Sequence, residues 1–219
     1  VNDVGKGKAS RGWLWVFEAP QLKMILFEFA PGRGHQVPME ILKDFKGDLQ
    51  TDGYSAYAKA FGDNELVRLS ACLIHIRRGF KEAHTQHRKA VQEVLTWFNI
   101  IYKLEKQART QGFSDEQRLA MRLKHTKPFV DRIKHWLDEQ KQQNLPPDSP
   151  IARAVNYALN RWDKLQRFFE DGKIDLDTNS TENAIRPSTI FRKNSLFAGN
   201  EHGAERAALF YSLLETCKL

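Results

Sequence analysis

Two carboxylates in separate parts of the chain have the type and setting needed for metal-dependent chemistry on a phosphate backbone. Asp52 ends the predicted strand 48–52, and Gly53 allows the backbone to turn sharply after it. Glu182 lies one turn into a predicted short helix and is followed closely by arginines. Carboxylates that converge from different elements hold pairs of Mg²⁺, which activate water or a 3′-hydroxyl and stabilise the leaving oxygen. We therefore treat Asp52 and Glu182 as candidate metal ligands and catalytic residues.

Basic side chains near these sites are candidates for contact with phosphate groups. One group follows Glu182, and the other follows the predicted strand 66–74, at whose end His75 is expected to emerge. The candidate DNA-binding residues are His75, Arg77, Arg78, Arg186, Arg192 and Lys193.

Each candidate also has an ordinary structural explanation, which the sequence leaves open. Asp-Gly is a common turn pair, and Asn179 and Glu182 have the spacing of a helix capping box. Cys72 and His75 have the spacing of half a zinc site, but no second pair with suitable spacing follows them. Basic runs on helices are commonly solvated faces. The spacing of these residues therefore does not decide between function and structure.

Composition limits the class of protein. The chain has 219 residues, of which 28% are charged, with a net charge of +7 and a pI of about 9.4, which favours a polyanionic partner. Its two cysteines, Cys72 and Cys217, form no disulfide framework, so a reducing, cytoplasmic setting is expected. No apolar run is long enough to span a membrane, and no secretory signal is visible. The chain opens with Val1, which suggests a fragment or a trimmed chain.

The first third of the sequence has an α/β pattern. Apolar runs predict a hairpin from strands 13–17 and 22–29, because Ala19-Pro20-Gln21 punctuates them. Helical spacing predicts a helix over 37–45, and strand 48–52, helix 54–61 and strand 66–74 follow. This order predicts an α/β fold with a mixed sheet.

The middle of the chain is charged and helical from 76 to about 143, and a proline-rich linker covers 144–150. Helical spacing resumes over 151–169, and Pro187 is expected to end or kink the helix that carries Glu182. We therefore predict three segments: 1–75 as the first part of the core, 76–146 as a helical insertion, and 147–219 as the last part of the core.

Several long motifs resemble transposases of the insertion-sequence sixty-six type. Leu49-Gln50-Thr51-Asp52-Gly53-Tyr54-Ser55-Ala56-Tyr57 resembles the second-aspartate motif of that family. Cys72-x-x-His75-x-Arg77-Arg78-x-Phe80 resembles the next motif. The glutamate block is matched by Asp177-x-Asn179-x-x-Glu182-x-Ala184-Ile185-Arg186-Pro187, Arg192-Lys193-Asn194-x-Leu196-Phe197-x-Gly199, Gly203-x-x-Arg206-Ala207-Ala208 and Tyr211-Ser212-Leu213-Leu214-Glu215-Thr216. The resemblance covers nearly the whole chain from about Gly5 and has the motifs in the family's order.

The resemblance implies a ribonuclease-H-like mixed sheet with helices on its faces and a large helical insertion before the last catalytic helix. It implies chemistry in which three acids hold Mg²⁺, for which Mn²⁺ substitutes, to cleave the ends of a mobile element and join them to target DNA. Asp52 would be the second acid and Glu182 the third. The first acid would fall just upstream of Val1, so the chain is expected to be inactive alone.

The resemblance also implies DNA as the partner, a homo-oligomer in the active complex and a bacterial, nucleoid-associated location. Two other functions remain open at this stage. One is a ribonuclease-H-like nuclease that cuts without strand transfer, and the other is a non-catalytic DNA-binding remnant.

Overall fold

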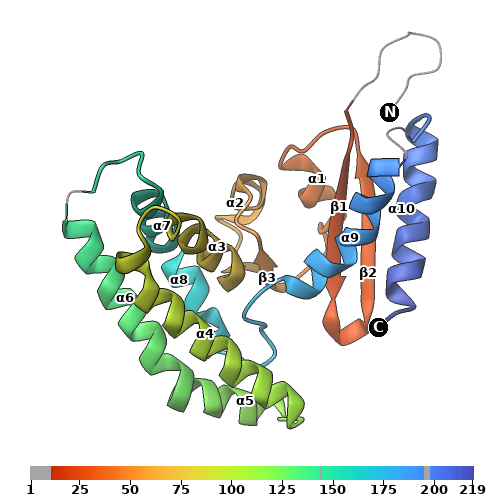
Figure 1. Ribbon diagram of the computed structural model, residues 1–219. Helices are drawn as coiled ribbons and strands as arrows, with labels where there is room; N and C mark the ends of the chain where they lie inside the picture. Colours follow the sequence, from red (N-terminus) through yellow and green to blue (C-terminus); the bar gives the residue numbers. More distant parts are fainter. Residues whose placement is uncertain (1–10, 144, 195–197) are drawn as a thin grey trace. The chain divides into compact units, whose positions relative to one another are not determined.

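The computed structural model describes residues 11–143, 145–194 and 198–219, with side chains described up to Ile190 and again from Ala198. The chain forms two compact units (Figure 1). Unit 1 consists of residues 1–44, 55–60 and 179–219, and unit 2 consists of residues 45–54 and 61–178. The division into three segments at 75/76 and 146/147 stays a prediction about domain organisation.

Unit 1 is built on an antiparallel hairpin, as the sequence predicts. Strand β1 (Trp13–Ala19) pairs with β2 (Met24–Ala30), with Trp15 opposite Glu28 and Phe17 opposite Leu26. A short 3-10 turn (Pro20–Leu22) connects them, and Lys23 closes it with a positive φ of 48°. The 3-10 turn therefore supplies the punctuation that Pro20 indicates.

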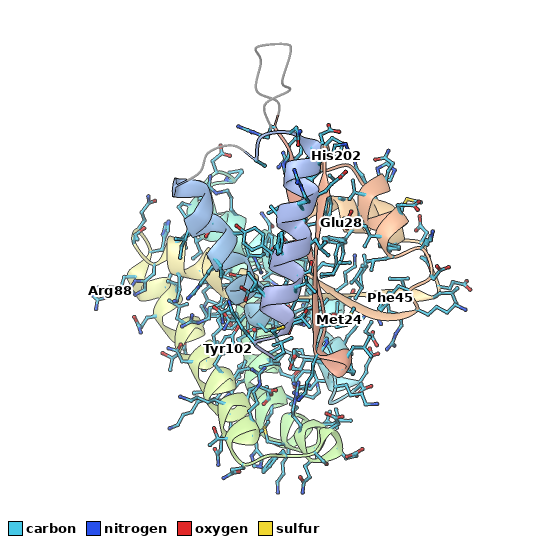
Figure 2. All side chains as sticks on the ribbon, turned by 90° about the vertical axis from the view of Figure 1, so that its right-hand side faces the viewer. Met24, Glu28, Phe45, Arg88, Tyr102 and His202 are labelled. Atoms are coloured by element: carbon cyan, nitrogen blue, oxygen red, sulfur yellow. The ribbon has the colours of Figure 1, made fainter. Side chains whose placement is uncertain are left out.

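Two helices complete the core of unit 1. Ile25 and Phe27 alternate along β2 and form a buried cluster with Ala184 of α9 (Asn179–Asn194) and Ala208 of α10 (Glu201–Thr216). Figure 2 shows β2 beside α10, with Glu28 nearer the end of the helix that carries His202. The remaining helices, α1 (Gln36–Ile41) and most of α2 (Ser55–Phe61), come from the segments between strands. Helix α1 is shorter than predicted because the backbone leaves the helical conformation at Leu42.

Unit 2 combines a parallel strand pair with a helical body. Strand β3 (Gly47–Thr51) pairs in parallel with β4 (Val67–Ala71), with Leu49 opposite Leu69. The helices that follow β4 are α3 (Leu73–Ala83), α4 (Arg88–Thr110), α5 (Asp115–Met121), a π-helical turn (Arg122–Thr126), α6 (Lys127–Gln142), α7 (Pro150–Leu159), α8 (Trp162–Leu165) and a 3-10 turn (Gln166–Phe169).

The helical body of unit 2 is held by the apolar stripes that the sequence predicts. In α4 the fully buried positions are Val91, Val94, Phe98 and Ile101, spaced to share one face. They join a continuous core with Phe80 of α3, Ile133 of α6 and Val155 of α7. Ser114 caps α5 in a capping box with Gln117. The helical character predicted after residue 76 is therefore confirmed.

The structure corrects three local predictions. The strand predicted over 66–74 ends at Ala71, and Leu73, Ile74 and His75 form the first turn of α3, because an apolar run alone does not distinguish a buried strand from a buried helix. The helix predicted over 151–169 is interrupted after Leu159. Pro187 lies inside α9, which is 16 residues long and runs past Pro187 to Asn194. The end of the helix that was predicted there is therefore wrong. The hydrogen bond that Pro187 cannot donate would go to the carbonyl of exposed Asn183, which water can reach.

The fold is mixed α/β, as predicted, and mostly helical. The single mixed sheet that was predicted is not formed by the described residues: their strands pair in one antiparallel and one parallel two-stranded sheet, one in each unit. None of the helices in the described part of the chain combines the length and apolar character needed to cross a membrane.

Candidate active site

Asp52 occupies the turn that follows the parallel strand β3 in unit 2. Its side chain is exposed, and one carboxylate oxygen, Oδ1, accepts a hydrogen bond from the Tyr54 N–H at 2.8 Å. The backbone then turns at Gly53, whose φ of +84° is in the left-handed region that favours glycine. The predicted position of Asp52 at the carboxyl end of a strand is therefore correct.

Two side chains, one on α7 and one just after its C-terminal end, form hydrogen bonds with the backbone of this turn. The Tyr157 hydroxyl donates to the Asp52 carbonyl at 3.0 Å, and Arg161 Nη2 donates to the Gly53 carbonyl at 3.1 Å. The Arg161 guanidinium also lies 3.8 Å from the centroid of the Tyr157 ring. Tyr157 and Arg161 were not selected from the sequence as site residues, because no local sequence signal identifies the turn that they contact.

A second group of polar residues in unit 2 surrounds the segment before α9. Asp177 is buried, at 9% exposure, and its charge acts on the nearby Tyr102 side chain. Burial, followed by the charge of Asp177, raises the pKa of the Tyr102 phenol. The Cys72 sulfur accepts a hydrogen bond from the Thr178 N–H at 3.3 Å, and Thr178 Oγ1 lies at the same distance. These contacts attach the end of the segment to α4 and to the residue that precedes α3.

Cys72 is better explained as a core residue than as a zinc ligand. It is 2% exposed, and burial raises the pKa of its thiol, which disfavours the thiolate that zinc binds. Within the described residues, no three His, Cys, Asp or Glu side chains are grouped so that they could hold a metal ion. The structure therefore offers no support for the zinc interpretation of the Cys72–His75 spacing.

The first group of predicted DNA-binding residues lies on α3. Arg77 donates to the Asn99 side chain at 2.7 Å and lies over the Tyr102 ring, so it links α3 to α4 inside unit 2. Arg78 is exposed, and His75 is partly buried. Of these three, Arg78 is therefore the most accessible to an external phosphate.

Glu182 belongs to unit 1, in the first turn of α9, and its side chain is partly buried. The preceding residue, Thr181, donates to Glu18 of β1 at 2.6 Å and so attaches this turn to the hairpin. Arg186 lies one turn further along α9 and is exposed. The side chains of Arg192 and Lys193 lie outside the described residues.

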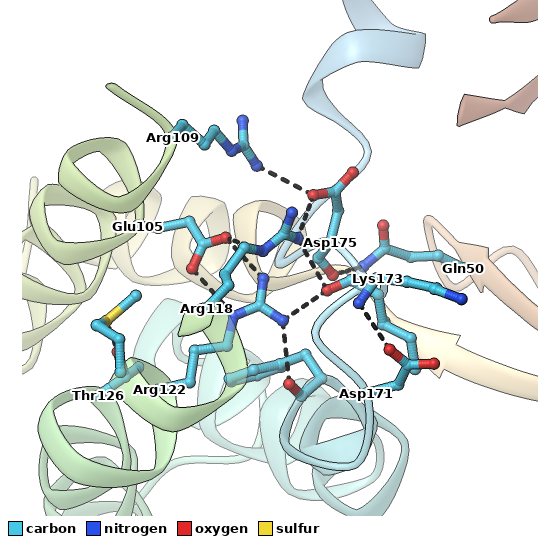
Figure 3. A network of polar contacts seen from close by, with 12 residues as sticks. Gln50, Glu105, Arg109, Arg118, Arg122, Thr126, Asp171, Lys173 and Asp175 are labelled. Atoms are coloured by element: carbon cyan, nitrogen blue, oxygen red, sulfur yellow. Dashed lines mark hydrogen bonds and ion pairs between the residues drawn. The ribbon is translucent and has the colours of Figure 1, made fainter. Parts of the chain in front are cut away.

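An ion-pair network in unit 2 holds the segment that leads toward α9 (Figure 3). Arg122 is fully buried and pairs with Glu105 at 3.0 and 2.6 Å. It also donates to the carbonyls of Phe168 and Ile174, at 3.1 and 2.8 Å. Arg118 pairs with both Glu105 and Asp175, at 2.9 and 2.6 Å. Burial lowers the pKa of Arg122, and its bonds to Glu105 oppose this effect.

The same segment is attached to the strand pair by Gln50. The Gln50 side chain of β3 donates to the Asp175 carbonyl at 2.6 Å. Helices α4 and α5 and strand β3, which leads into Asp52, therefore all contact Asp175 in the segment before α9. Glu105, Arg118 and Arg122 of this network were not selected from the sequence, because charged side chains are rarely buried without a partner and the sequence does not show which residues pair.

Comparison with known proteins assigns this architecture to a family. Residues 1–206 match the family model described as "Transposase IS66 family". The chain is 36% identical over 229 residues to the uncharacterized protein y4qI of Sinorhizobium fredii (strain NBRC 101917 / NGR234), covering 98% of the chain and 42% of that protein. It is 29% identical over 231 residues to the uncharacterized protein y4jD of the same organism, covering 99% of the chain and 44% of that protein. The chain thus spans less than half the length of these relatives, and no solved structure matches it significantly.

Proposed function

Because the chain belongs to the IS66 family of transposases, we propose that it is the catalytic part of an enzyme that cleaves DNA at the ends of an insertion sequence and joins the freed strands to target DNA. The observation that carries this proposal is the setting of Asp52. It is an exposed carboxylate that directly follows a parallel strand, and the backbone of its turn accepts hydrogen bonds from Tyr157 of α7 and from Arg161, which lies between α7 and α8. Side chains at the carboxyl ends of such strands commonly form active sites.

We propose Asp52 and Glu182 as two of the three acids that hold divalent metal. Carboxylate oxygens are hard ligands that suit Mg²⁺, and an oxygen that accepts one N–H, as Asp52 Oδ1 does, keeps a lone pair for a cation. Mg²⁺, when bound, activates the attacking oxygen and stabilises the leaving one. The role of Asp52 is to present its carboxylate in a fixed direction, and the role of Glu182 is to add a second negative ligand. The family resemblance assigns the first acid to a strand outside these 219 residues.

We also propose a ribonuclease-H-like arrangement for the complete catalytic domain. The helices between β4 and α9 support this proposal, because the resemblance implies a large helical insertion before the last catalytic helix. In this proposal the helical region between β4 and α9 is an insertion into the core.

We propose that DNA contacts the exposed basic residues of the chain. Arg78 and Arg186 are exposed and lie on the same helices as predicted site residues. His75, Arg77, Arg192 and Lys193 remain predicted contacts. A homo-oligomer acting on paired element ends is part of the same proposal.

The test uses the chain extended upstream to include the strand that carries the first acid, with Mg²⁺ and labelled DNA bearing the element ends. Asp52→Asn and Glu182→Gln are expected to abolish cleavage, since each removes a charged metal ligand while conserving size. Asp148→Asn and Glu201→Gln, at exposed positions, are the matched controls and should retain full activity. Cleavage that survives Asp52→Asn would refute the assignment.

The same assay separates the alternatives. Cleavage without joining to target DNA would support a nuclease that lacks strand transfer. DNA binding without any cleavage would support a non-catalytic DNA-binding protein.

A further inference from the structure

We propose that Tyr157 and Arg161 are positioning residues that fix the direction of the Asp52 carboxylate by holding the backbone of its turn. This inference rests on the proposed function for its catalytic meaning, but the restraint itself is a property of unit 2 alone. Neither residue is proposed to touch DNA or metal.

The restraint consists of two hydrogen bonds to consecutive carbonyl groups. Tyr157 donates to the carbonyl of Asp52 and Arg161 to that of Gly53, at 3.0 and 3.1 Å. Fixing two successive peptide groups limits the rotation of the backbone on both sides of the Gly53 Cα. The Asp52 side chain is attached at one end of this restrained segment, so its direction is limited as well.

The close approach of the two side chains explains a requirement for glycine beyond its φ angle. A Cβ atom at position 53 would lie 2.6 Å from Arg161 Nε and 2.8 Å from the Tyr157 hydroxyl oxygen. Both distances are shorter than contacts that real Cβ atoms make. Gly53 therefore allows the chain to turn and also allows the two side chains to reach the backbone.

Helix α7 is a suitable support because it is anchored in the core of unit 2. Ile151, Ala154, Val155 and Ala158 are buried, and Ser149 caps the helix by accepting a hydrogen bond from the Ala152 N–H. The next helix, α8, adds the buried side chains of Trp162 and Leu165. Tyr157 and Arg161 therefore project from packed elements toward a turn, which is the arrangement expected of a support for a catalytic group.

The chemistry of the pair suits a permanent restraint. Burial raises the pKa of the Tyr157 phenol, so its hydroxyl remains a proton donor throughout the neutral range. The Arg161 guanidinium presents several N–H groups in a planar fork. It donates to the Tyr157 carbonyl at 3.4 Å as well as to Gly53, and stacking on the Tyr157 ring holds it in place.

The first experiment measures backbone order in the 219-residue chain by NMR relaxation. In the unaltered chain, the amide order parameters of Gly53 and Tyr54 should match those of rigid backbone, about 0.85. In Tyr157→Phe combined with Arg161→Met they should fall below about 0.6, whereas the amides of β3 should keep their values. Order parameters at Gly53 and Tyr54 that do not change would overturn the inference.

Three further variants support this test. Arg153→Met makes the same substitution at an exposed position of α7 and should leave the turn unchanged. Tyr157→Phe alone removes a single oxygen and conserves the ring, so it remains informative if the double variant fails to fold. Arg161→Lys should restore order only in part, since an ammonium group lacks the planar fork that holds Arg161 between the Tyr157 ring and the Gly53 carbonyl.

The second experiment uses the extended, active chain and compares kcat with KM for DNA. Tyr157→Phe and Arg161→Met are expected to lower kcat at least about ten-fold with KM and melting temperature nearly unchanged, because displacement of a catalytic group slows the chemical step. A rise in KM alone would contradict a positioning role. If no extended chain cleaves DNA, the proposed function fails, while the order parameters still decide whether the restraint exists.

Discussion

The Ser212 hydroxyl of α10 accepts a hydrogen bond from the Phe27 N–H of β2 at 2.8 Å, although 185 residues separate them. One turn further along α10, Thr216 makes the corresponding contact with the Ile25 N–H at 3.0 Å. These two hydroxyls satisfy the backbone groups on the edge of β2 that does not pair with β1. A helix thus covers a strand edge that would otherwise be open to pairing with another chain.

Replacing Ser212 by Ala should therefore destabilise the protein although alanine favours helices. The Phe27 N–H loses its partner in a partly buried position, which is expected to cost about 1–2 kcal/mol in the free energy of unfolding. Urea denaturation measures this value. Ser188→Ala is the matched control, because that hydroxyl donates to a carbonyl of its own helix, that of Ile185, and the substitution should change stability by less than about 0.5 kcal/mol.

Removing Arg122 should be among the most damaging single changes in unit 2. Arg122→Met leaves Glu105 buried without its bidentate partner and deprives the Phe168 and Ile174 carbonyls of a donor. The expected loss of stability is about 3–5 kcal/mol, measured by chemical denaturation. The double variant Arg122→Met/Glu105→Leu should recover part of this loss, since it also removes the buried carboxylate that Arg122 pairs with. A double variant that is as unstable as the sum of the two single variants would contradict this account.

Substitutions at two glycines with positive φ, Gly112 and Gly53, distinguish the cost of backbone strain from the cost of steric contact with neighbouring side chains. Gly112 has a φ of +66°, and no atom of the described residues beyond its immediate neighbours lies within 4 Å of the position that a Cβ would take there. Gly112→Ala should therefore cost only about 1–2 kcal/mol from the left-handed backbone. Gly53→Ala has similar backbone strain and also displaces Arg161 and Tyr157, so we expect a larger loss in thermal unfolding. Equal losses would show that these two side chains do not pack against the turn.

The protein should lose stability in alkaline solution. Burial raises the pKa values of the Cys72 thiol and the Tyr102 and Tyr157 phenols, so the folded state holds these protons more tightly than the unfolded state. This contribution is complete below the unfolded pKa values, about 8.5 for cysteine and 10 for tyrosine, and is lost as the pH rises through the folded values. Denaturation experiments between pH 7 and 11 should show that the free energy of unfolding begins to decline at about pH 8.5. Cys72→Ala should delay its onset, and an unchanged profile would argue against the thiol.

Thiol reactivity gives an independent test of the same burial. Cys217 is exposed and Cys72 is buried, so an alkylating reagent at neutral pH should modify one thiol rapidly and the other only after unfolding. Mass spectrometry of peptides identifies the modified residue. Rapid modification of both cysteines in the folded chain would contradict the packing described for the residue that precedes α3.

The sequence by itself determined the features that depend on neighbours in the chain. The hairpin follows from two apolar runs separated by Pro20, the α4 stripe follows from the spacing of Val91 to Ile101, and the α5 cap follows from Ser114. The end of a strand predicted at Asp52 is likewise confirmed, since β3 ends one residue before it. These patterns are readable because helix period, strand alternation and capping act over a few residues.

Only the tertiary structure decided which distant surfaces meet. It placed Tyr157 and Arg161 against a turn more than 100 residues earlier, buried Arg122 beside Glu105, and placed the Ser212 hydroxyl on the edge of β2. It also made His75 helical and kept Pro187 inside α9, against the local patterns. The physical reason is that the local sequence around a side chain does not specify its partner in a distant segment. Its role depends on which groups become its neighbours when the core packs.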